Sequence, residues 1–314
     1  MTGVTARAIA DFLGAELCGA DRPVEHMCTI ANPRPFHLAF AKELSPEHAQ
    51  TLAGALDTIV LVQSQDRGRI ANTHIPVAVP RSAFARVVAA FFTPPVDRSV
   101  ASTACIHPTA RIGDGAAIGE YCVIGPNAVI GDGTVLRHHV VVAANVAIGR
   151  DCLIKSHTVI GEEGFGISRD EAGNNIRVPH LGSCRIGNHV ELGAFNTVAS
   201  GTIEPTVVED HVKTDDHVHI AHNCHVGRNT IITACAELSG SVRVGERVWL
   251  GPNCSIMNGV EIGDDALVGI GACVVRSVPP GVTVMGVPAR DAAEFKAIQG
   301  MLKRLLPGHE GTES

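Results

Sequence analysis

The amino-acid sequence predicts a mainly β protein built on a six-residue repeat, with a small α/β domain before the repeat and a helix after it. Three observations support this fold class. An aliphatic residue recurs at every sixth position from Ile106, with two interruptions, as far as Val274. Two residues before it stands a small residue, such as Ala104 or Ala110. Aromatic residues make up only 4% of the chain, which suits a narrow interior lined by aliphatic side chains.

Each repeat is expected to contribute one short strand with two inward-facing residues. Side chains two positions apart on a strand share a face, so the aliphatic and the small residue both point inward. Glycine or aspartate commonly follows the aliphatic residue, which predicts a corner of the chain at that position. Five of the ten cysteines occupy the small inward position and are expected to be buried: Cys122, Cys152, Cys184, Cys224 and Cys254. Because no CxxC pair occurs, the cysteines are predicted to be reduced thiols of a cytoplasmic protein.

Such hexapeptide repeats resemble those of the left-handed parallel β-helix, in which three hexads form one triangular coil of 18 residues. The resemblance implies the handedness and about eight coils, because the chain has 25 repeat positions. We predict this domain over residues 101–278. Loops at 162–183 and 202–206 interrupt it, and loops on a rigid scaffold commonly carry function.

The segments on either side of the repeat predict separate structures. Residues 1–100 are expected to form the α/β domain, which is a candidate to contact a nucleotide or substrate. Residues 279–314 form a C-terminal extension, in which the Val-Pro-Pro-Gly stretch 278–281 ends the repeat and 292–306 reads as an amphipathic helix. In the first domain we expect helices after Thr5 (ending at Gly14), after Ser45 and after Ser82 (over 83–92), and strands over 58–63 and 75–79.

Charge and hydropathy exclude two classes of partner. The net charge of −7 and the lack of a basic run argue against nucleic-acid binding, which needs a concentrated basic surface. No stretch reaches the ~18 consecutive apolar residues of a transmembrane helix. The N-terminal segment lacks the apolar core of a signal peptide.

Histidines concentrate between residues 213 and 225, and this segment carries a resemblance. The stretch 220–223, Ile-Ala-His-Asn, looks like the catalytic segment of the UDP-3-O-acylglucosamine N-acyltransferases, a family of lipid A and lipopolysaccharide synthesis. The chain is similar to that family at other places along nearly its whole length: 38–40, 159–166, 180–182, 190–193 and 212–215. The resemblance identifies His222 as the catalytic base.

The chemistry of acyl transfer explains why a histidine is needed at this position. An amine that attacks a thioester must lose a proton, and a neutral imidazole is a natural acceptor near pH 7. Asp215 is a candidate to orient that ring. Gly240 follows His222 by one coil, so stacking is expected to bring the two together, and the family uses a glycine N–H at this position to bind the oxyanion.

The resemblance also implies the ligands and the assembly. It implies a nucleotide-linked amino sugar as acceptor and, as donor, the phosphopantetheine thioester of acyl carrier protein, with no bound metal or cofactor. Phe40, Phe165, His219 and Asn223 are the candidate substrate-binding residues. The family forms homotrimers with active sites between subunits, and we expect the same here.

Several segments depart from the family pattern. Residues 199–201 read Ala-Ser-Gly instead of Asp-Arg-Gly, a uracil-binding Asn-Pro-Lys-Tyr is replaced near 45–48 by Ser-Pro-Glu-His, and a second expected histidine is missing at 258–260. The segments 277–281 and 286–289 instead resemble the ending of acetyl-CoA-dependent hexapeptide acetyltransferases. The nucleotide and the acyl donor therefore stay open.

Three alternatives remain from the sequence alone. The first is an acetyl-CoA-dependent N-acetyltransferase of a UDP- or dTDP-amino sugar for O-antigen or another glycan. The second is a γ-type carbonic anhydrase, also a left-handed β-helix, which binds zinc with histidines from neighbouring subunits. His217 and His222 have the local spacing of two such ligands, and His180, in the loop upstream, lies close to the place of a third. The third is a non-catalytic structural or sugar-binding solenoid.

Overall fold

The computed structural model describes residues 3–305 and divides the chain into two compact units. The first unit runs to Pro95 and the second begins at Val96. Among the described residues, no helix combines the length and the apolar character that crossing a bilayer requires. Each unit is described by itself below.

The first unit is a small α/β domain, as predicted. Its four strands form one parallel sheet in the order β1-β2-β3-β4: β1 (His26–Met27), β2 (His37–Phe40), β3 (Ile59–Gln63) and β4 (His74–Val77). Its helices are α1 (Ala6–Leu13), α2 (Pro46–Ala53) and α3 (Pro80–Val87), with the short helical turns η1 (Ser64–Asp66) and η2 (Val88–Phe92). The strand β2 was not predicted from the sequence, although its central residues Leu38 and Ala39 are fully buried.

Two of the three predicted helix starts are confirmed. The Thr5 hydroxyl accepts a hydrogen bond from the Ala8 N–H at 3.2 Å, and Gly14 ends α1 with φ +63°. Ser45 caps α2 in the same way. The expected start of α3 after Ser82 is wrong, because the helix begins at Pro80. Proline has a fixed φ and no N–H, and both properties suit the first position of a helix.

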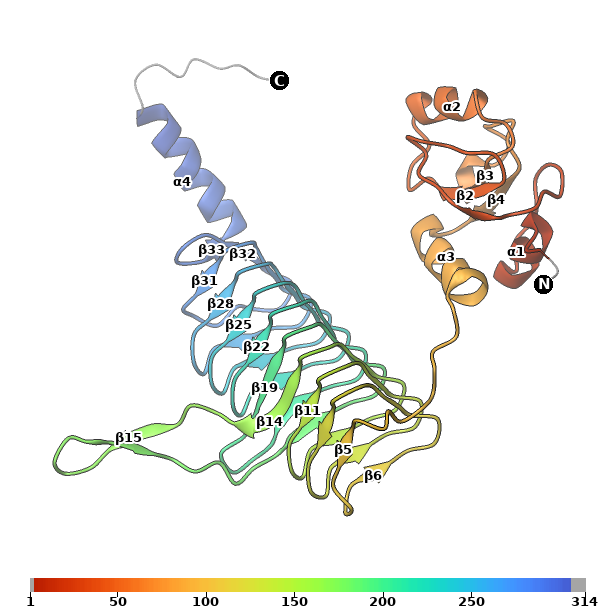
Figure 1. The fold of residues 1–314 in the computed structure, drawn as a ribbon. Helices are drawn as coiled ribbons and strands as arrows, with labels where there is room; N and C mark the ends of the chain where they lie inside the picture. The colour runs from red at the N-terminus through yellow and green to blue at the C-terminus, as the bar shows by residue number, and fades with distance from the viewer. Residues whose placement is uncertain (1–2, 306–314) are drawn as a thin grey trace. The chain divides into compact units, whose positions relative to one another are not determined.

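The second unit is a parallel β-helix whose strands stack into three sheets (Figure 1). Sheet 1 contains β5 (Cys105–Ile106), β8 (Val123–Ile124), β11 (Val141–Val142), β14 (Val159–Glu163), β19 (Thr197–Ser200), β22 (His219–Ile220), β25 (Glu237–Leu238), β28 (Ser255–Ile256) and β31 (Cys273–Val274). Sheet 2 contains β6 (Arg111–Ile112), β9 (Val129–Ile130), β12 (Ala147–Ile148), β17 (Cys184–Ile186), β20 (Thr206–Val208), β23 (His225–Val226), β26 (Arg243–Val244) and β29 (Glu261–Ile262). Sheet 3 contains β7 (Ala117–Ile118), β10 (Val135–Leu136), β13 (Leu153–Ile154), β18 (Glu191–Leu192), β21 (Lys213–Thr214), β24 (Ile231–Ile232), β27 (Trp249–Leu250), β30 (Leu267–Val268), β32 (Thr283–Met285) and the antiparallel β33 (Arg290–Asp291).

The strand register confirms that one coil consists of three hexads. Ile124 pairs with Val142, and Val142 pairs with Ile160, so equivalent residues of successive coils lie directly above one another. The aliphatic residues fill the interior, where Ile124 is 1% exposed, and the small position beside it is filled by residues such as Cys122 at 0%. Burial raises the pKa of Cys184 to about 12, which fits an inert core thiol.

The corner of each hexad lies two residues later than expected. The left-handed backbone occurs at the third residue after the aliphatic one, as at Asn127 (φ 56°) after Ile124. The glycine directly after the aliphatic residue serves a different need. A methyl group built on Gly119 would lie 2.7 Å from the Arg137 carbonyl oxygen of the next coil, so glycine is required there for close stacking.

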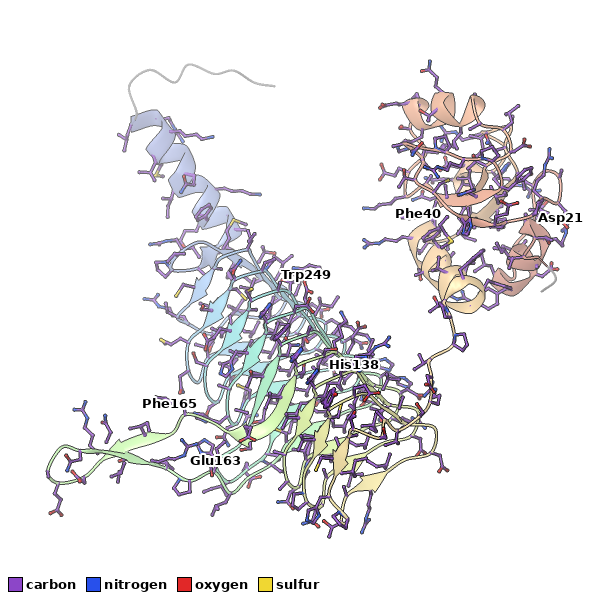
Figure 2. The ribbon with its side chains drawn as sticks, viewed as in Figure 1. Asp21, Phe40, His138, Glu163, Phe165 and Trp249 are labelled. Carbon is purple, nitrogen blue, oxygen red and sulfur yellow. The ribbon has the colours of Figure 1, made fainter. Side chains whose placement is uncertain are left out.

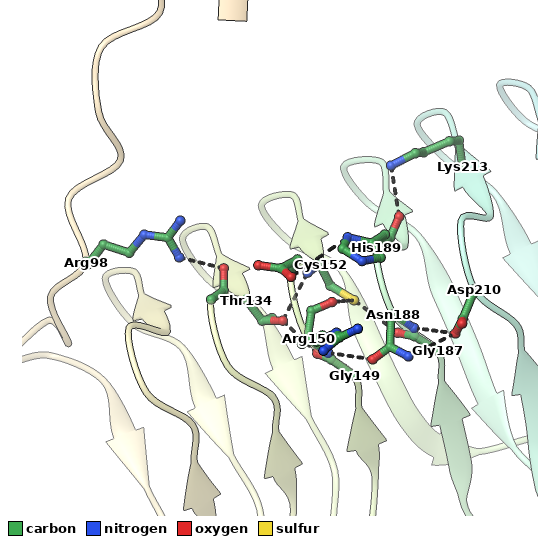
Figure 3. Close-up of polar contacts among 12 residues, drawn as sticks. Arg98, Thr134, Gly149, Arg150, Cys152, Gly187, Asn188, His189, Asp210 and Lys213 are labelled. Atoms are coloured by element: carbon green, nitrogen blue, oxygen red, sulfur yellow. Dashed lines mark hydrogen bonds and ion pairs between the residues drawn. The ribbon is translucent and has the colours of Figure 1, made fainter. Parts of the chain in front are cut away.

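Polar side chains connect successive coils along one corner (Figure 3). The Arg150 N–H donates to Asn188 Oδ1 at 3.1 Å, and the Asn188 N–H donates to Asp210 Oδ1 at 2.7 Å. The Asn188 hydrogen bonds hold the pKa of Asp210 below its ordinary value. These bonds satisfy backbone donors that the strands leave unpaired at the turn.

The β-helix ends one strand later than predicted. Val268 pairs in parallel with Val284, so β32 adds a strand after the expected stop at 278–281. The sequence phase does break there, but the chain returns to sheet 3 after the two prolines. The helix α4 (Ala292–Leu305) follows as expected, and the predicted residue 306 lies outside the described part.

Both predicted interruptions leave the coil between sheet 1 and sheet 2. The longer one extends β14 and then forms an antiparallel hairpin of β15 (Ile167–Arg169) and β16 (Asn175–Arg177), which projects from the side of the helix (Figure 1). The shorter one joins β19 to β20.

Candidate active site

A cleft of about 420 Å³ opens on sheet 1 where the hairpin leaves the β-helix. Its lining comes from the hairpin root and from the outer face of β19, β22 and β25, and consists of Glu162, Glu163, Gly164, Phe165, Thr197, Ala199, His219, Ala221, His222, Glu237, Ser239, Gly240 and Asn258. A larger groove of about 610 Å³ lies over the last strands of sheet 2. We assign the site to the smaller cleft because it contains the predicted base and the predicted oxyanion donor.

The structure brings His222 and Gly240 together, as the repeat length predicts. A methyl group built on Gly240 would lie 2.6 Å from Cε1 and 2.8 Å from Nε2 of His222. The imidazole therefore rests directly against the Gly240 backbone. Within residues 3–305, no hydrogen bond uses the Gly240 N–H, which leaves this donor available.

Asn223 fixes the tautomer of the His222 ring. The Asn223 side-chain oxygen accepts hydrogen bonds from the Thr202 N–H at 3.2 Å and the Thr202 hydroxyl at 3.1 Å. The same oxygen lies 3.0 Å from His222 Nδ1, so Nδ1 is the protonated nitrogen that donates to it. Nε2 then carries the free lone pair, and it faces the Gly240 side of the ring. This is the nitrogen that a general base uses.

Asp215 does not take the orienting position that we expected. It follows β21 in sheet 3, whereas His222 follows β22 in sheet 1. Its carboxylate is exposed and accepts from the Asp216 N–H. One hexad is one side of the triangular coil, so residues about one hexad apart lie at different corners, and within one chain Asn223 makes the orienting contact.

His180 is a neighbour of His222, a contact that the sequence did not predict. The two rings meet edge to face, with centroids 5.3 Å apart and planes at 76°. His180 is 7% exposed, its Nδ1 donates to the Val178 carbonyl at 2.9 Å, and its buried Nε2 has no partner among the described residues. Gly164 separates the rings, since a methyl group there would lie 2.8 Å from His222 Cβ and 3.0 Å from His180 Nε2. The two histidines are 42 residues apart in the sequence, and the hairpin between them brings them together. Their spacing does not follow the repeat, so it did not predict the contact.

The candidate substrate-binding residues have different positions. Phe165 is 83% exposed at the root of the hairpin, where Figure 2 labels it with Glu163. His219 lines the cleft. Phe40 belongs to the first unit, where its ring packs against Phe84 with centroids 4.9 Å apart.

Glu237 and Ser239 also line the cleft and were not identified from the sequence. The Ser239 hydroxyl donates to Glu237 Oε1 at 3.0 Å. Both side chains point outward from β25 and its continuation, because the inward residue between them is the fully buried Leu238. A repeat analysis that follows inward positions does not single out such outward residues.

His217 and His222, whose spacing suggested a γ-type carbonic anhydrase, lie at different corners of the coil and form no metal centre with each other within one chain. The His217 ring stacks on Phe195 with centroids 5.1 Å apart, within a column of rings along a different corner of the helix. His222 faces Gly240 and His180 instead. Across residues 3–305, His, Cys, Asp and Glu side chains form no group of three with metal-binding geometry.

Known proteins resemble this chain along most of its length. A protein of Delftia acidovorans (strain DSM 14801 / SPH-1), described as UDP-3-O-acylglucosamine N-acyltransferase, is 37% identical over 311 residues, which cover 95% of this chain and 90% of that protein. A protein of the same description from Bordetella pertussis is 33% identical over 150 residues, or 46% of this chain and 41% of that protein.

Solved structures and family models agree with the fold. LpxA from Acinetobacter baumannii is 27% identical with a TM-score of 0.57, covering 68% of this chain and 86% of that one. The UDP-N-acetylglucosamine O-acyltransferase (LpxA) from Moraxella catarrhalis is 27% identical with a TM-score of 0.57, covering 66% of this chain and 81% of that one. The model for the bacterial transferase hexapeptide (six repeats) matches residues 205–240 and 241–275, and that for the GMPPB C-terminal domain matches 100–206.

Proposed function

Since this chain belongs to the UDP-3-O-acylglucosamine N-acyltransferase family, we propose that it transfers an acyl group from a thioester to the amino group of a nucleotide-linked amino sugar. The acceptor we propose is UDP-3-O-acylglucosamine or a close analogue, and the process is the synthesis of lipid A or a related lipopolysaccharide component. The observation that carries the proposal is the His222 imidazole resting on the Gly240 backbone, with its Nε2 left free by the Asn223 contact.

The proposed mechanism assigns one role to each of these groups. His222 Nε2 removes a proton as the acceptor nitrogen attacks the thioester carbonyl carbon, and the Gly240 N–H donates to the oxyanion that forms. As the C–S bond breaks, the imidazolium returns this proton to the leaving sulfur, so the products are an amide and a free thiol. A placed general base contributes about 10²–10⁴ in rate, and one oxyanion donor contributes about 10²–10³ in kcat.

We propose the phosphopantetheine thioester of acyl carrier protein as the donor. Acetyl-CoA is the second candidate, because residues 286–289 resemble the ending of acetyl-CoA-dependent hexapeptide acetyltransferases. Residues 286–289, Gly-Val-Pro-Ala, lead into α4 and pack against it, since a methyl group on Gly286 would lie 2.8 Å from the Phe295 ring.

The working form that we propose is a homotrimer in the cytoplasm. The outer face of sheet 3 supports the trimer, because Ile231, Trp249 and Leu267 form an apolar row there and are 37%, 44% and 39% exposed in the single chain. The ten free cysteines suit a reducing compartment. Light scattering that finds a monomer at working concentration would contradict the trimer.

A donor comparison tests the function. Purified protein is mixed with acetyl-CoA or with a 3-hydroxyacyl carrier protein, each with UDP- and dTDP-amino sugars, and both thiol release and the acylated sugar are measured. We expect amide product with the carrier-protein donor and a UDP-linked acceptor. Product with acetyl-CoA alone would select the second donor, and no product with any pair would contradict the proposed function.

A further inference from the structure

We propose that Glu237 is the residue that selects an amine as the acyl acceptor, by binding the acceptor's ammonium group through its carboxylate. This inference rests on the proposed function and adds to it a binding residue for the reacting nitrogen. Glu237 and His222 line the same cleft, and Glu237 precedes the oxyanion donor Gly240 by three residues.

The position of Glu237 follows from the strand register. Glu237 pairs with His219 on the neighbouring strand, and Leu238 pairs with Ile220, so the strand β25 lies directly beside β22. Continuing along both strands brings Gly240 to His222. The Glu237 side chain therefore projects from the same outer face, on the strand that carries the oxyanion donor.

The carboxylate of Glu237 is held in place but has no cationic partner. The Ser239 hydroxyl donates to Oε1 at 3.0 Å, which uses one of its acceptor sites. In the described part of the chain, no nitrogen of Lys, Arg or His lies within 4.0 Å of this carboxylate. Glu163, at the hairpin root, is instead neutralised by Arg177 at 2.7 Å. The half-buried Glu237 thus offers an uncompensated negative charge to a ligand in the cleft.

The charge of Glu237 also acts on the groups beneath it. Burial raises the pKa of Cys224 to about 11 and that of Cys254 to about 12, and the negative charge of Glu237 adds to both increases.

The chemistry of the reaction favours an ammonium group over other occupants. A carboxylate at this place repels the oxyanion of the tetrahedral intermediate and cannot donate to it. It does attract an amine that arrives protonated, and charge-assisted hydrogen bonds are about twice as strong as neutral ones. A hydroxyl acceptor has no positive charge, so Glu237 favours N-acylation over O-acylation.

The proton balance is consistent with this role. An ammonium nitrogen loses two protons in becoming an amide nitrogen. One proton passes to solvent before attack and frees the lone pair, and His222 carries the other to the leaving sulfur. Glu237 keeps its charge throughout and orients the nitrogen by accepting one of its N–H bonds.

The test measures binding without a donor, by calorimetry on the full-length protein. The two ligands are UDP-3-O-acylglucosamine and its analogue with a hydroxyl in place of the amino group. We expect the unmodified protein to bind the amine at least about tenfold more tightly than the hydroxyl analogue. The Glu237→Gln protein should bind both ligands with the same affinity, which should equal the affinity of the unmodified protein for the analogue. Ser239→Ala, which removes the hydroxyl that holds Glu237, should reduce the preference for the amine less than Glu237→Gln does. Glu261→Gln, which changes a carboxylate at the equivalent strand position of sheet 2, should keep it.

The outcomes separate this inference from the proposed function. A Glu237→Gln protein that keeps the full preference for the amine would overturn the role of Glu237 and leave the function standing. Loss of affinity for both ligands in Glu237→Gln would also overturn it, because it would indicate a general disturbance of the cleft. If the unmodified protein binds neither ligand, the proposed function fails, and the role of Glu237 fails with it.

Discussion

The His222 side chain sits in a slot that two glycines make possible. Gly164 lies against its Cβ and Gly240 against its Cε1 and Nε2. Asn223 holds Nδ1 from a third side, and the rings of His180 and His222 meet edge to face. The ring therefore has one orientation, and a pre-oriented base loses little entropy when it reacts.

Replacing His222, the proposed base, should abolish most of the activity. We expect His222→Ala to lower kcat by about 10²–10⁴ with little change in the melting temperature, because the half-buried ring belongs to the cleft and not to the core. The measurement is the initial rate of amide formation. His211→Ala, which removes a ring stacked on His189 at another corner, is the matched control and should keep its rate. Equal rates in the two variants would contradict the assignment.

Filling the slot should separate activity from folding. A Gly240→Ala side chain would lie 2.6 Å from His222 Cε1, so the ring must move away from the reacting centre. We expect kcat to fall by about 10² or more, since a displacement of about 1 Å can have that effect. Circular dichroism should stay native. Unchanged kcat would show that the ring position is unimportant.

The Asp210 carboxylate should make stability depend on pH. Its pKa is lowered in the folded state, so its contribution is complete above the unfolded-state value of ~3.9 and disappears as the pH falls through the lower folded-state value. Asp210→Asn keeps an acceptor for the Asn188 N–H but removes the charge. We expect a melting temperature about 1 °C lower at pH 7, since the group is only partly buried, and a difference that shrinks as the pH falls below the unfolded-state value. A difference that grows in acid would contradict this sign.

At the scale of the element, the coil is defined by how closely its backbone stacks. Where a glycine follows the aliphatic residue, it leaves space for the backbone of the next coil, as Gly119 does for the Arg137 carbonyl. After Ile160 the chain leaves the coil, and the hairpin brings Gly164 and His180 to His222. The close approach of backbone and side chains thus shapes both the stacked coils and the proposed active site.

A single methyl group should test that stacking. We expect Gly119→Ala to destabilise the protein by about 1–3 kcal/mol, because the added Cβ overlaps the Arg137 carbonyl and rigid backbone must shift. Gly300→Ala in α4, where nothing lies within 4 Å, is the control and should be neutral or slightly stabilising. Chemical denaturation measures both. Equal stability of the two variants would show that the coils can separate without cost.

At the scale of the whole molecule, the two units have separate cores. The core of the β-helix is built from residues after 100, and that of the first unit from residues before 95. We therefore expect a variant that begins at Val96 to keep the β-sheet circular dichroism and the melting transition of the β-helix. If Phe40 contacts the nucleotide, the variant should show a higher KM for the acceptor and an unchanged KM for the donor. Loss of the β-helix transition would show that the cores depend on each other.

The sequence by itself determined the coil, because a period of six with two inward residues per repeat leaves few other ways to bury the aliphatic side chains. It also determined the contact of His222 with Gly240, since both are fixed by the length of one coil. Helix caps at Thr5 and Ser45 were equally local, and so they were predictable.

The tertiary structure alone decided which side chains from different corners, strands and loops of the β-helix lie close to His222. Residues about one hexad apart lie at different corners, and this separates Asp215 from His222. Within one chain, Asn223 makes the contact with His222 Nδ1 that we expected of Asp215. The hairpin has no six-residue repeat, and where its chain returns to the β-helix it brings His180 to the His222 ring. Glu237 was overlooked because outward residues of a repeat have no pattern, and only the register of neighbouring strands shows which of them share a cleft.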